Sequence, residues 1–144
     1  MIKIICVGKL KEKYLSDGVN DYLTRIKKYH KIDLIELPDS NIDNEGNEIL
    51  KHLSNKDYII SLAIKGTQLS STELADKIDK IFISNPNITF IIGGSNGIRE
   101  DVLHKSNMLL SFSKLTYPHG LFRLILLEQI YRSFKILNNE TYHK

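Results

Sequence analysis

The chain alternates short apolar runs with longer stretches in which apolar residues recur every three or four positions. The apolar runs predict buried strands at residues 2–7, 32–37, 58–64, 88–92 and 108–112. The helical spacing predicts helices at residues 9–28, 44–53, 71–82, 99–105 and 118–137. This alternation indicates an α/β fold, a parallel sheet with helices on both faces. Ligands bind beyond the carboxyl ends of such strands, so the expected pocket is formed by the loops after Ile64, Ile92 and Phe112.

Local signals refine several of these elements. Gly18 interrupts the first helix, at a cost of about 1 kcal/mol relative to alanine, and marks a candidate kink. Ser71 stands before an acidic first turn and is expected to cap the third helix. Lys65 and Gly66 are expected to form the turn that ends the third strand. The buried face of the first helix is expected to comprise Leu10, Tyr14, Val19, Tyr22 and Ile26.

Length and composition are those of one globular unit. With 144 residues, of which 42% are hydrophobic, the chain has room for one domain with a real core. No repeat or linker divides it, so residues 1–144 are expected to form a single domain. The lone Cys6 excludes an intramolecular disulfide and is expected to be a buried hydrophobe. No apolar run approaches ~20 residues, which predicts no membrane span, and the N-terminus predicts no signal peptide. A cytoplasmic protein is therefore expected.

The charge distribution permits an RNA partner without demanding one. The net charge is +3, and residues 105–144 carry six Lys and Arg against two Glu. His30, His52 and His104 lie in polar contexts and are expected at the surface. No two histidines have metal-ligand spacing with a cysteine or carboxylate, so no metal site is predicted.

Glycines follow the fourth predicted strand directly, in the sequence IIGGSNG at residues 91–97. Backbone N–H groups in such a turn are able to cradle an anion. The spacing matches neither the dinucleotide-binding fingerprint nor a Walker loop. From the residues alone, a tight strand-to-helix turn is the stronger interpretation.

The last predicted helix is apolar on two sides, where an amphipathic helix needs only one stripe. It is expected either to be a central core helix or to pack against a second subunit. Arg123 and Arg132 interrupt its apolar surface. Because buried charges need partners, they are interpreted either as structural pairs, such as Arg123 with Glu128, or as contacts to RNA phosphates.

Both ends of this helix carry further candidate chemistry. Pro118 holds His119 in the first turn, beside a short polar loop at residues 112–117. The chain ends in Tyr142, His143 and Lys144. Because chain ends usually fray, the residues by themselves predict a disordered tail.

The succession of strand, glycine turn, strand, polar loop and closing helix, ending in Tyr-His-Lys, resembles the SPOUT (α/β-knot) RNA methyltransferases. Within that family it resembles the small bacterial enzymes that methylate a pseudouridine in large-subunit ribosomal RNA. The resemblance covers essentially the whole chain and is weakest at residues 38–57, a segment that looks shorter than usual. It implies a C-terminal trefoil knot and a homodimer formed through the last helix.

The resemblance also implies S-adenosyl-L-methionine as the cofactor and assigns its binding residues. A loop whose backbone N–H and C=O groups are available suits a neutral adenine. The implied contacts are Leu62, Gly93, Gly94 and the loop residues Phe112, Ser113, Lys114, Leu115, Thr116 and Tyr117.

The implied reaction methylates the position-3 ring nitrogen of a pseudouridine in 23S ribosomal RNA, within folded RNA or the assembled ribosome. The candidate catalytic residues, as base or to steer a water, are His119, Tyr142 and His143. The candidate phosphate contacts are Arg123, Arg132 and Lys144. In the family the tail lies over the partner's pocket. The alternative is a non-enzymatic ribosome-associated or nucleotide-binding module, which explains the basic segment and the glycine turn but not the tail.

Overall fold

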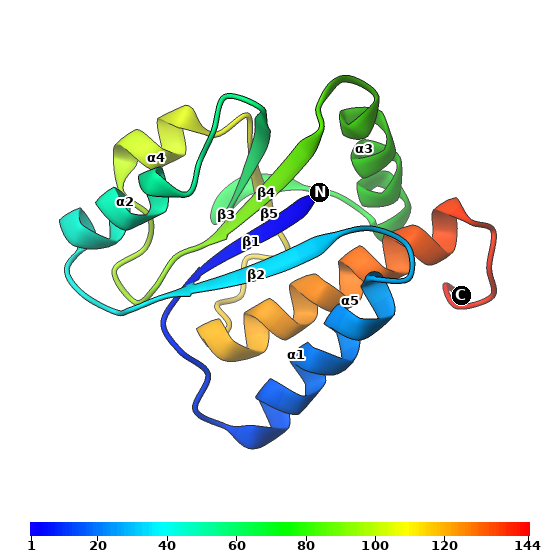
Figure 1. Ribbon diagram of the computed structural model, residues 1–144, viewed down its shortest axis with the longest axis horizontal. Helices are drawn as coiled ribbons and strands as arrows, with labels where there is room; N and C mark the ends of the chain where they lie inside the picture. The colour runs from blue at the N-terminus through cyan, green and yellow to red at the C-terminus, as the bar shows by residue number, and fades with distance from the viewer.

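The computed structural model describes residues 1–144 (Figure 1). Its elements, in chain order, are β1 (Ile2–Val7), α1 (Lys13–Ile26), β2 (Ile32–Leu37), α2 (Ile42–Lys51), β3 (Asp57–Gln68), α3 (Ser71–Ser84), β4 (Asn87–Ile92), α4 (Glu100–Lys105), β5 (Met108–Ser111) and α5 (His119–Leu137). No helix combines the length and the apolar character that crossing a bilayer requires.

The strands form one five-stranded sheet in the order β2-β1-β4-β3-β5, and every pairing is parallel. β1 lies between β2 and β4, with Ile2 opposite Ile32 on one side and Ile88 on the other. Strands buried on both faces must be apolar at nearly every position, which is why β1 and β4 read as continuous Ile-rich runs. The α/β fold predicted from the sequence, with its parallel sheet, is confirmed.

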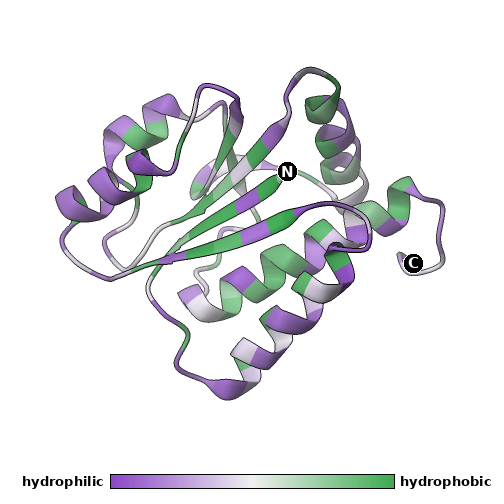
Figure 2. Cartoon of the chain, in the orientation of Figure 1, coloured by the Kyte–Doolittle hydropathy of each residue, from purple (hydrophilic) through white to green (hydrophobic).

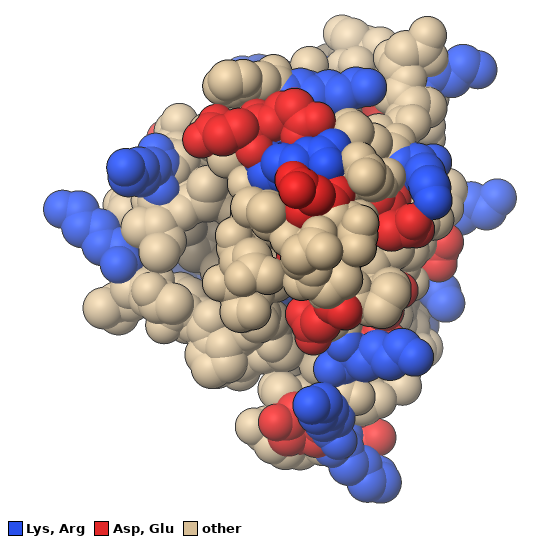
Figure 3. All heavy atoms as spheres, turned by 90° about the vertical axis from the view of Figure 1, so that its left-hand side faces the viewer, with Lys and Arg blue, Asp and Glu red and all other residues tan.

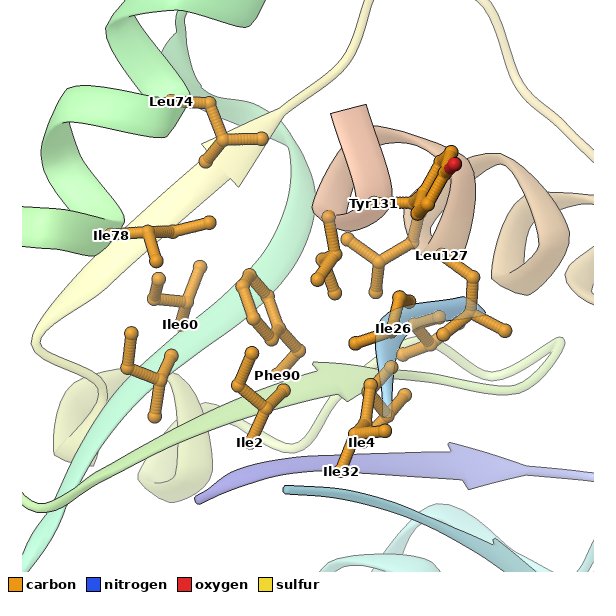
Figure 4. Close-up of a cluster of buried hydrophobic side chains, with 14 of the residues drawn as sticks. Ile2, Ile4, Ile26, Ile32, Ile60, Leu74, Ile78, Phe90, Leu127 and Tyr131 are labelled. Carbon is orange, nitrogen blue, oxygen red and sulfur yellow. The ribbon is translucent and has the colours of Figure 1, made fainter. Parts of the chain in front are cut away.

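Helices cover both faces of the sheet: α1, α3 and α5 lie on one face, and α2 and α4 on the other (Figure 1). Successive side chains of a strand point to opposite faces. In β1, Ile2, Ile4 and Cys6 therefore join the larger core beneath α1, α3 and α5, part of which is drawn in Figure 4. Ile5 and Val7 join the smaller core beneath α2 and α4. Burial raises the pKa of the Cys6 thiol to about 12, as expected for a buried cysteine.

The first helix differs from its prediction. It begins at Lys13 rather than at residue 9, and the turn before it is held by the Leu10 backbone N–H, which donates to Glu36 Oε2 at 3.1 Å. Leu15 and not Tyr14 occupies the core position, because Leu15 lies four residues before the buried Val19 and shares its face, whereas Tyr14 is 70% exposed. The helix continues without interruption through Gly18.

The third strand is longer than predicted, because Lys65 and Gly66 belong to it. Its pairing with β5 shifts between Leu62 and Thr67, and Leu110 of β5 is paired with both. A Cβ at Gly66 would lie 2.6 Å from the Leu109 carbonyl, so only glycine allows this approach of the two backbones. The helix that follows is capped by Ser70, not Ser71, in a reciprocal hydrogen-bonding arrangement with Glu73.

The last helix packs between α1 and α3, and its buried residues include Leu126, Leu127 and Ile130. The remaining apolar residues are only partly covered; among them are Leu121 and Ile125. Figure 2 shows the contrast, with α5 largely hydrophobic and the outer side of α1 hydrophilic. The helix is therefore a core helix that also has apolar surface not covered by the rest of the chain.

Candidate active site

A pocket of about 580 Å³ opens at the carboxyl ends of β3, β4 and β5. Figure 3 looks onto this end of the molecule, where the surface is hollowed. The position agrees with the rule that ligands of parallel sheets bind beyond the strand ends. Of the residues predicted to bind the cofactor, the structure gathers Leu62, Gly93, Gly94, Phe112, Ser113, Leu115, Thr116 and Tyr117 around this pocket. Lys114 is the exception: it is exposed and outside the lining.

The glycine turn forms one wall of the pocket. Gly97 N–H donates to the Gly94 carbonyl at 3.0 Å, and Gly97 has a φ of 76°, in the left-handed region that favours glycine. A Cβ on Gly93 would lie 2.8 Å from the Gly97 carbonyl, and one on Gly94 would lie 2.8 Å from Val7 Cγ1. Both glycines are thus needed for the turn itself, and they also bring bare backbone to the pocket.

The polar loop at residues 112–117 is held by its serines. Ser111 Oγ donates to the Ser113 carbonyl at 3.0 Å, and Ser113 Oγ accepts from Leu115 N at 3.0 Å. Ser113 Oγ also lies 3.0 Å from the Tyr117 hydroxyl. The Phe122 ring lies 5.1 Å from that of Phe112. The result is an ordered loop beside an aromatic wall, which suits a ligand with a flat neutral ring.

Sequence reasoning missed two further parts of the lining. Ala63 and Ile64 line the pocket from the end of the predicted strand, and Lys65 lines it because β3 extends past that end. Glu100 and His104 of α4 lie at the mouth, with His104 Nε2 3.5 Å from Glu100 Oε2 and both side chains 81% exposed. The surface position predicted for His104 is confirmed. Nothing in the local sequence of α4 indicates that it faces β5 across a pocket.

His119 lines the pocket from the first turn of α5, directly after the capping residue Pro118. It is partly buried, and its position follows from the proline, whose extended conformation (φ −58°, ψ 143°) starts the helix. It is the one predicted catalytic residue that this subunit brings to its own pocket.

Arg123 lies one turn further along α5 and is 2% exposed. The pairing with Glu128 suggested by the sequence is wrong: Nη1 donates to Glu36 Oε2 at 2.7 Å, and Nη2 donates to the Gly8 carbonyl at 3.1 Å. The guanidinium joins the start of α5 to the ends of β1 and β2. A phosphate has no access to a group so enclosed, and this position argues against the predicted RNA contact of Arg123.

Arg132 lies near the other end of α5 and forms the ion pair with Glu128, at 2.6 Å. Its guanidinium also lies over the Tyr142 ring, 4.8 Å from the centroid, and Nη1 is 3.1 Å from His143 Nδ1. Arginine only donates hydrogen bonds, so His143 Nδ1 is the acceptor, and its proton in the neutral form is on Nε2. Arg132 therefore orients the tail.

The tail is docked on α5 and is not frayed. Tyr142 packs edge-on against Tyr131, with 5.0 Å between ring centroids. Burial raises the pKa of the Tyr142 hydroxyl to about 12, and a hydrogen bond with Tyr22 adds to the shift. His143 and Lys144 are exposed. Tyr142 packs on Tyr131 and His143 contacts Arg132, so the tail lies beside the C-terminal half of α5. At 1.5 Å per residue, Arg132 is roughly 20 Å along the helix axis from His119 at the pocket.

Comparisons with known proteins agree along the whole chain. A family profile described as "Predicted SPOUT methyltransferase" matches residues 1–143. The chain is 46% identical to "Ribosomal RNA large subunit methyltransferase H" of Enterococcus faecalis and 47% identical to that of Alkaliphilus oremlandii, over 99% of each chain. A protein of Methanococcus maripaludis, named as a putative enzyme of this kind, is 48% identical over the same share.

A solved structure resembles this one in fold. It is a probable methylase family protein from Haemophilus influenzae, with a TM-score of 0.58 and 15% identity. The match covers 99% of this chain and 70% of the other. At this identity the likeness concerns the fold alone.

Proposed function

Because the chain belongs to the SPOUT methyltransferase family, we propose that it transfers the methyl group of S-adenosyl-L-methionine to large-subunit ribosomal RNA. The observation that carries the proposal is the pocket at the ends of β3, β4 and β5, lined by the glycine turn and the polar loop. The proposed acceptor is the position-3 nitrogen of a pseudouridine in 23S RNA, within folded RNA or the assembled ribosome. Residues 1–144 would act as one catalytic domain in the cytoplasm.

The pocket's residues fit this cofactor. Its volume of about 580 Å³ lies within the range of small-molecule sites, and apolar and aromatic side chains dominate the walls. Leu62, Gly93, Gly94 and the loop at residues 112–117 would hold the nucleoside and the amino-acid portion. When bound, S-adenosyl-L-methionine would supply an electrophilic methyl group on its sulfonium sulfur, and the thioether S-adenosyl-L-homocysteine would leave as the methyl group passes to the acceptor nitrogen. The contribution of this chain is to align the acceptor and to take up its proton.

The three catalytic candidates divide by their hydrogen-bonding state. Tyr142, with a pKa of about 12, keeps its proton at neutral pH and serves as a donor. His143 presents Nε2–H because Arg132 occupies Nδ1. We therefore propose that His119 accepts the proton, directly or through a water. Tyr142 and His143 of the tail would donate hydrogen bonds that position the target pseudouridine. Lys144 remains the proposed phosphate contact.

The distance between tail and pocket supports a homodimer. A tail docked roughly 20 Å along α5 from His119 does not reach its own pocket, but it is able to reach the pocket of a second subunit. α5 also retains partly exposed apolar residues, including Leu121, Leu124 and Ile125, that a partner would cover. We propose that two copies pair through α5 so that each tail closes over the partner's pocket. Light scattering that shows a monomer at micromolar concentration would refute this pairing.

A trefoil knot in the C-terminal half is also proposed. The pairing of Leu110 with Leu62 before the β3 irregularity and with Thr67 after it supports the idea that the β3 chain bends around β5. The close approach of Gly66 to Leu109 is consistent with this path.

Two measurements test the proposed function. Calorimetry should show one S-adenosyl-L-methionine bound per subunit. Mass spectrometry of 23S RNA, after incubation of unmodified ribosomes with the protein and cofactor, should show one added methyl group on a pseudouridine. If the protein binds ribosomes but not the cofactor, it is instead a non-enzymatic ribosome-associated module.

A variant tests the proposed role of His119. The His119→Ala protein should bind the cofactor normally, while its rate of methyl transfer to ribosomes falls.

A further inference from the structure

A second hollow, of about 710 Å³, lies at the other end of the sheet, where α1, α3 and α5 end and β2 and β4 begin. Its principal lining residues are Lys28, Tyr29, His30, Asp79, Phe82 and Phe134. We name it the amino-end pocket. None of these residues takes part in the candidate active site. The sequence predicted His30 at the surface, and the structure leaves it partly buried.

Flat rings form one wall of the amino-end pocket. The His30 ring stacks on Phe82 with 4.4 Å between centroids and 20° between planes, and it lies 5.9 Å and 18° from Phe134. Phe134 in turn stacks on Tyr29 at 5.8 Å and 5°. The His30 Nδ1 lies 3.1 Å from the Lys31 carbonyl, which only accepts, so Nδ1 is the donor and the tautomer is set. These rings stack on one another in the order Phe82, His30, Phe134 and Tyr29, so a nucleobase would extend the row at its Phe82 end.

The polar groups of this pocket complement a nucleotide. Lys28 lies in the lining and Lys27 and Lys31 are close in sequence, and no carboxylate lies within ion-pair distance of any of the three. These cations suit phosphate oxygens, whereas the Asp79 carboxylate, also in the lining, opposes a phosphate and suits the amino groups of a base. The Asn85 and Asn138 amides donate to backbone carbonyls, which leaves their side-chain oxygens as acceptors for the amino groups of a base.

The amino-end pocket is joined to the tail. The Tyr29 hydroxyl donates to Glu140 Oε1 at 2.7 Å, and Lys135 Nζ lies 3.1 Å from Glu140 Oε2. Glu140 precedes Tyr142 by two residues, so this pocket and the tail form one continuous surface. If the tail closes over the partner's active site, RNA leaving that site passes the amino-end pocket.

We propose that the amino-end pocket binds an unpaired nucleotide of the RNA substrate, a few nucleotides away from the methylated base. The base stacks on the outer face of Phe82, whose other face is supported by His30, and its phosphate pairs with Lys28. The inference rests on the proposed function, since it takes the substrate to be RNA. It adds a binding subsite outside the catalytic pocket, and each dimer would carry two of these subsites.

Nuclear magnetic resonance tests the subsite without any methyl transfer. Protein saturated with S-adenosyl-L-methionine is titrated with uridine 5′-monophosphate and, separately, with adenosine 5′-monophosphate. Resonances of His30, Phe82 and Asn138 should shift with added nucleotide, and those of the candidate active site should not. Absence of shifts at the amino-end pocket with both nucleotides, up to millimolar concentrations, would overturn the inference.

Steady-state methylation of ribosomes gives the second readout. Lys28→Ala and His30→Ala should each raise the KM for ribosomes about tenfold, equivalent to ~1.4 kcal/mol, with kcat and cofactor affinity nearly unchanged. Lys51→Ala, on α2 at the opposite face of the sheet, is the matched control. Lys28 is a surface residue, so Lys28→Ala should fold normally. Its KM for ribosomes still tests the proposal if the His30→Ala protein fails to fold.

The outcomes separate the two proposals. Methyl transfer with an unchanged KM in folded Lys28→Ala protein overturns the subsite and leaves the methyltransferase standing, even if nucleotides shift the resonances. Failure of the unmodified protein to methylate ribosomes overturns the proposed function, and the subsite with it.

Discussion

The buried ion pair between Arg123 and Glu36 allows a quantitative test of how the start of α5 is held. Arg123 is 2% exposed, whereas the Glu36 side chain is 34% exposed. Glu36→Ala removes the charge that balances the guanidinium and also the acceptor of Leu10 N–H. Arg123→Met instead removes the buried charge and fills the space with an apolar chain.

Glu36→Ala should lower the free energy of unfolding more than Arg123→Met does. The reason is that a buried charge without a partner destabilises the fold more than an apolar side chain in its place. Breaking a buried pair from one side costs about 3–5 kcal/mol, and the partial exposure of Glu36 reduces this to about 2–3 kcal/mol. Arg123→Met also removes the Nε group, which is buried without a hydrogen-bond partner. The loss of the bond to the Gly8 carbonyl offsets part of that gain, so the net change should stay within about 1 kcal/mol.

Urea unfolding followed by circular dichroism measures both. With an m value of about 2 kcal/mol/M, Glu36→Ala should lower the midpoint by about 1 M or more, and Arg123→Met by less than half of that. Glu36→Gln, which keeps an acceptor for Leu10, should fall between them. Asp76→Ala, which breaks the exposed pair with Lys80, is the control and should leave the midpoint unchanged. If Arg123→Met lowered the midpoint as much as Glu36→Ala, the reasoning would be wrong.

Three further outcomes are expected. Gly66→Ala should destabilise the protein by about 1–3 kcal/mol in the same urea assay, because its Cβ meets the Leu109 carbonyl at 2.6 Å; a neutral effect would contradict the close approach. Deleting residues 142–144 should abolish methyl transfer to ribosomes while calorimetry shows a smaller loss of cofactor affinity, and full activity would rule out a functional tail. Asp57 is desolvated, which acts to raise its pKa, but hydrogen bonds from Ser54 and the charge of Lys3 outweigh this and lower it below 3.8. The ionised Asp57 carboxylate therefore stabilises the fold fully above about pH 4, and this contribution is lost as the pH falls through the lowered pKa of the folded state. When the free energy of unfolding is followed as the pH is lowered from 4, the Asp57→Asn protein should lose less stability than the unmodified protein.

Much of the architecture follows from local pattern. Ile-rich runs too short for helices, separated by helical periodicity, predict a parallel sheet covered on both faces, because strands buried on both sides have no polar positions. The same reasoning places the pocket at the strand ends. Residue pattern and family resemblance together predicted the residues around it well, since all but Lys114 line one pocket. Their binding role remains a prediction.

Local pattern failed where a residue's environment is set by a distant segment. The start of α1 was wrong because Leu10 is apolar but packs from a loop anchored by Glu36, 26 residues away. β3 was predicted too short because Lys65 and Gly66 have the composition of a turn, whereas backbone contact with β5 keeps them in the strand.

The sequence by itself therefore determined the class of fold, the elements and, through resemblance, the family. Only the tertiary structure decided which charges pair and which surfaces meet. Arg123 has a suitable acid five residues away in Glu128 but pairs with Glu36, 87 residues away, because α5 packs over the ends of β1 and β2. His30 is polar in sequence but stacks between Phe82 and Phe134, because α1, α3 and α5 end at the same place. The reason is general: periodicity records which side of an element is buried, but not which element buries it.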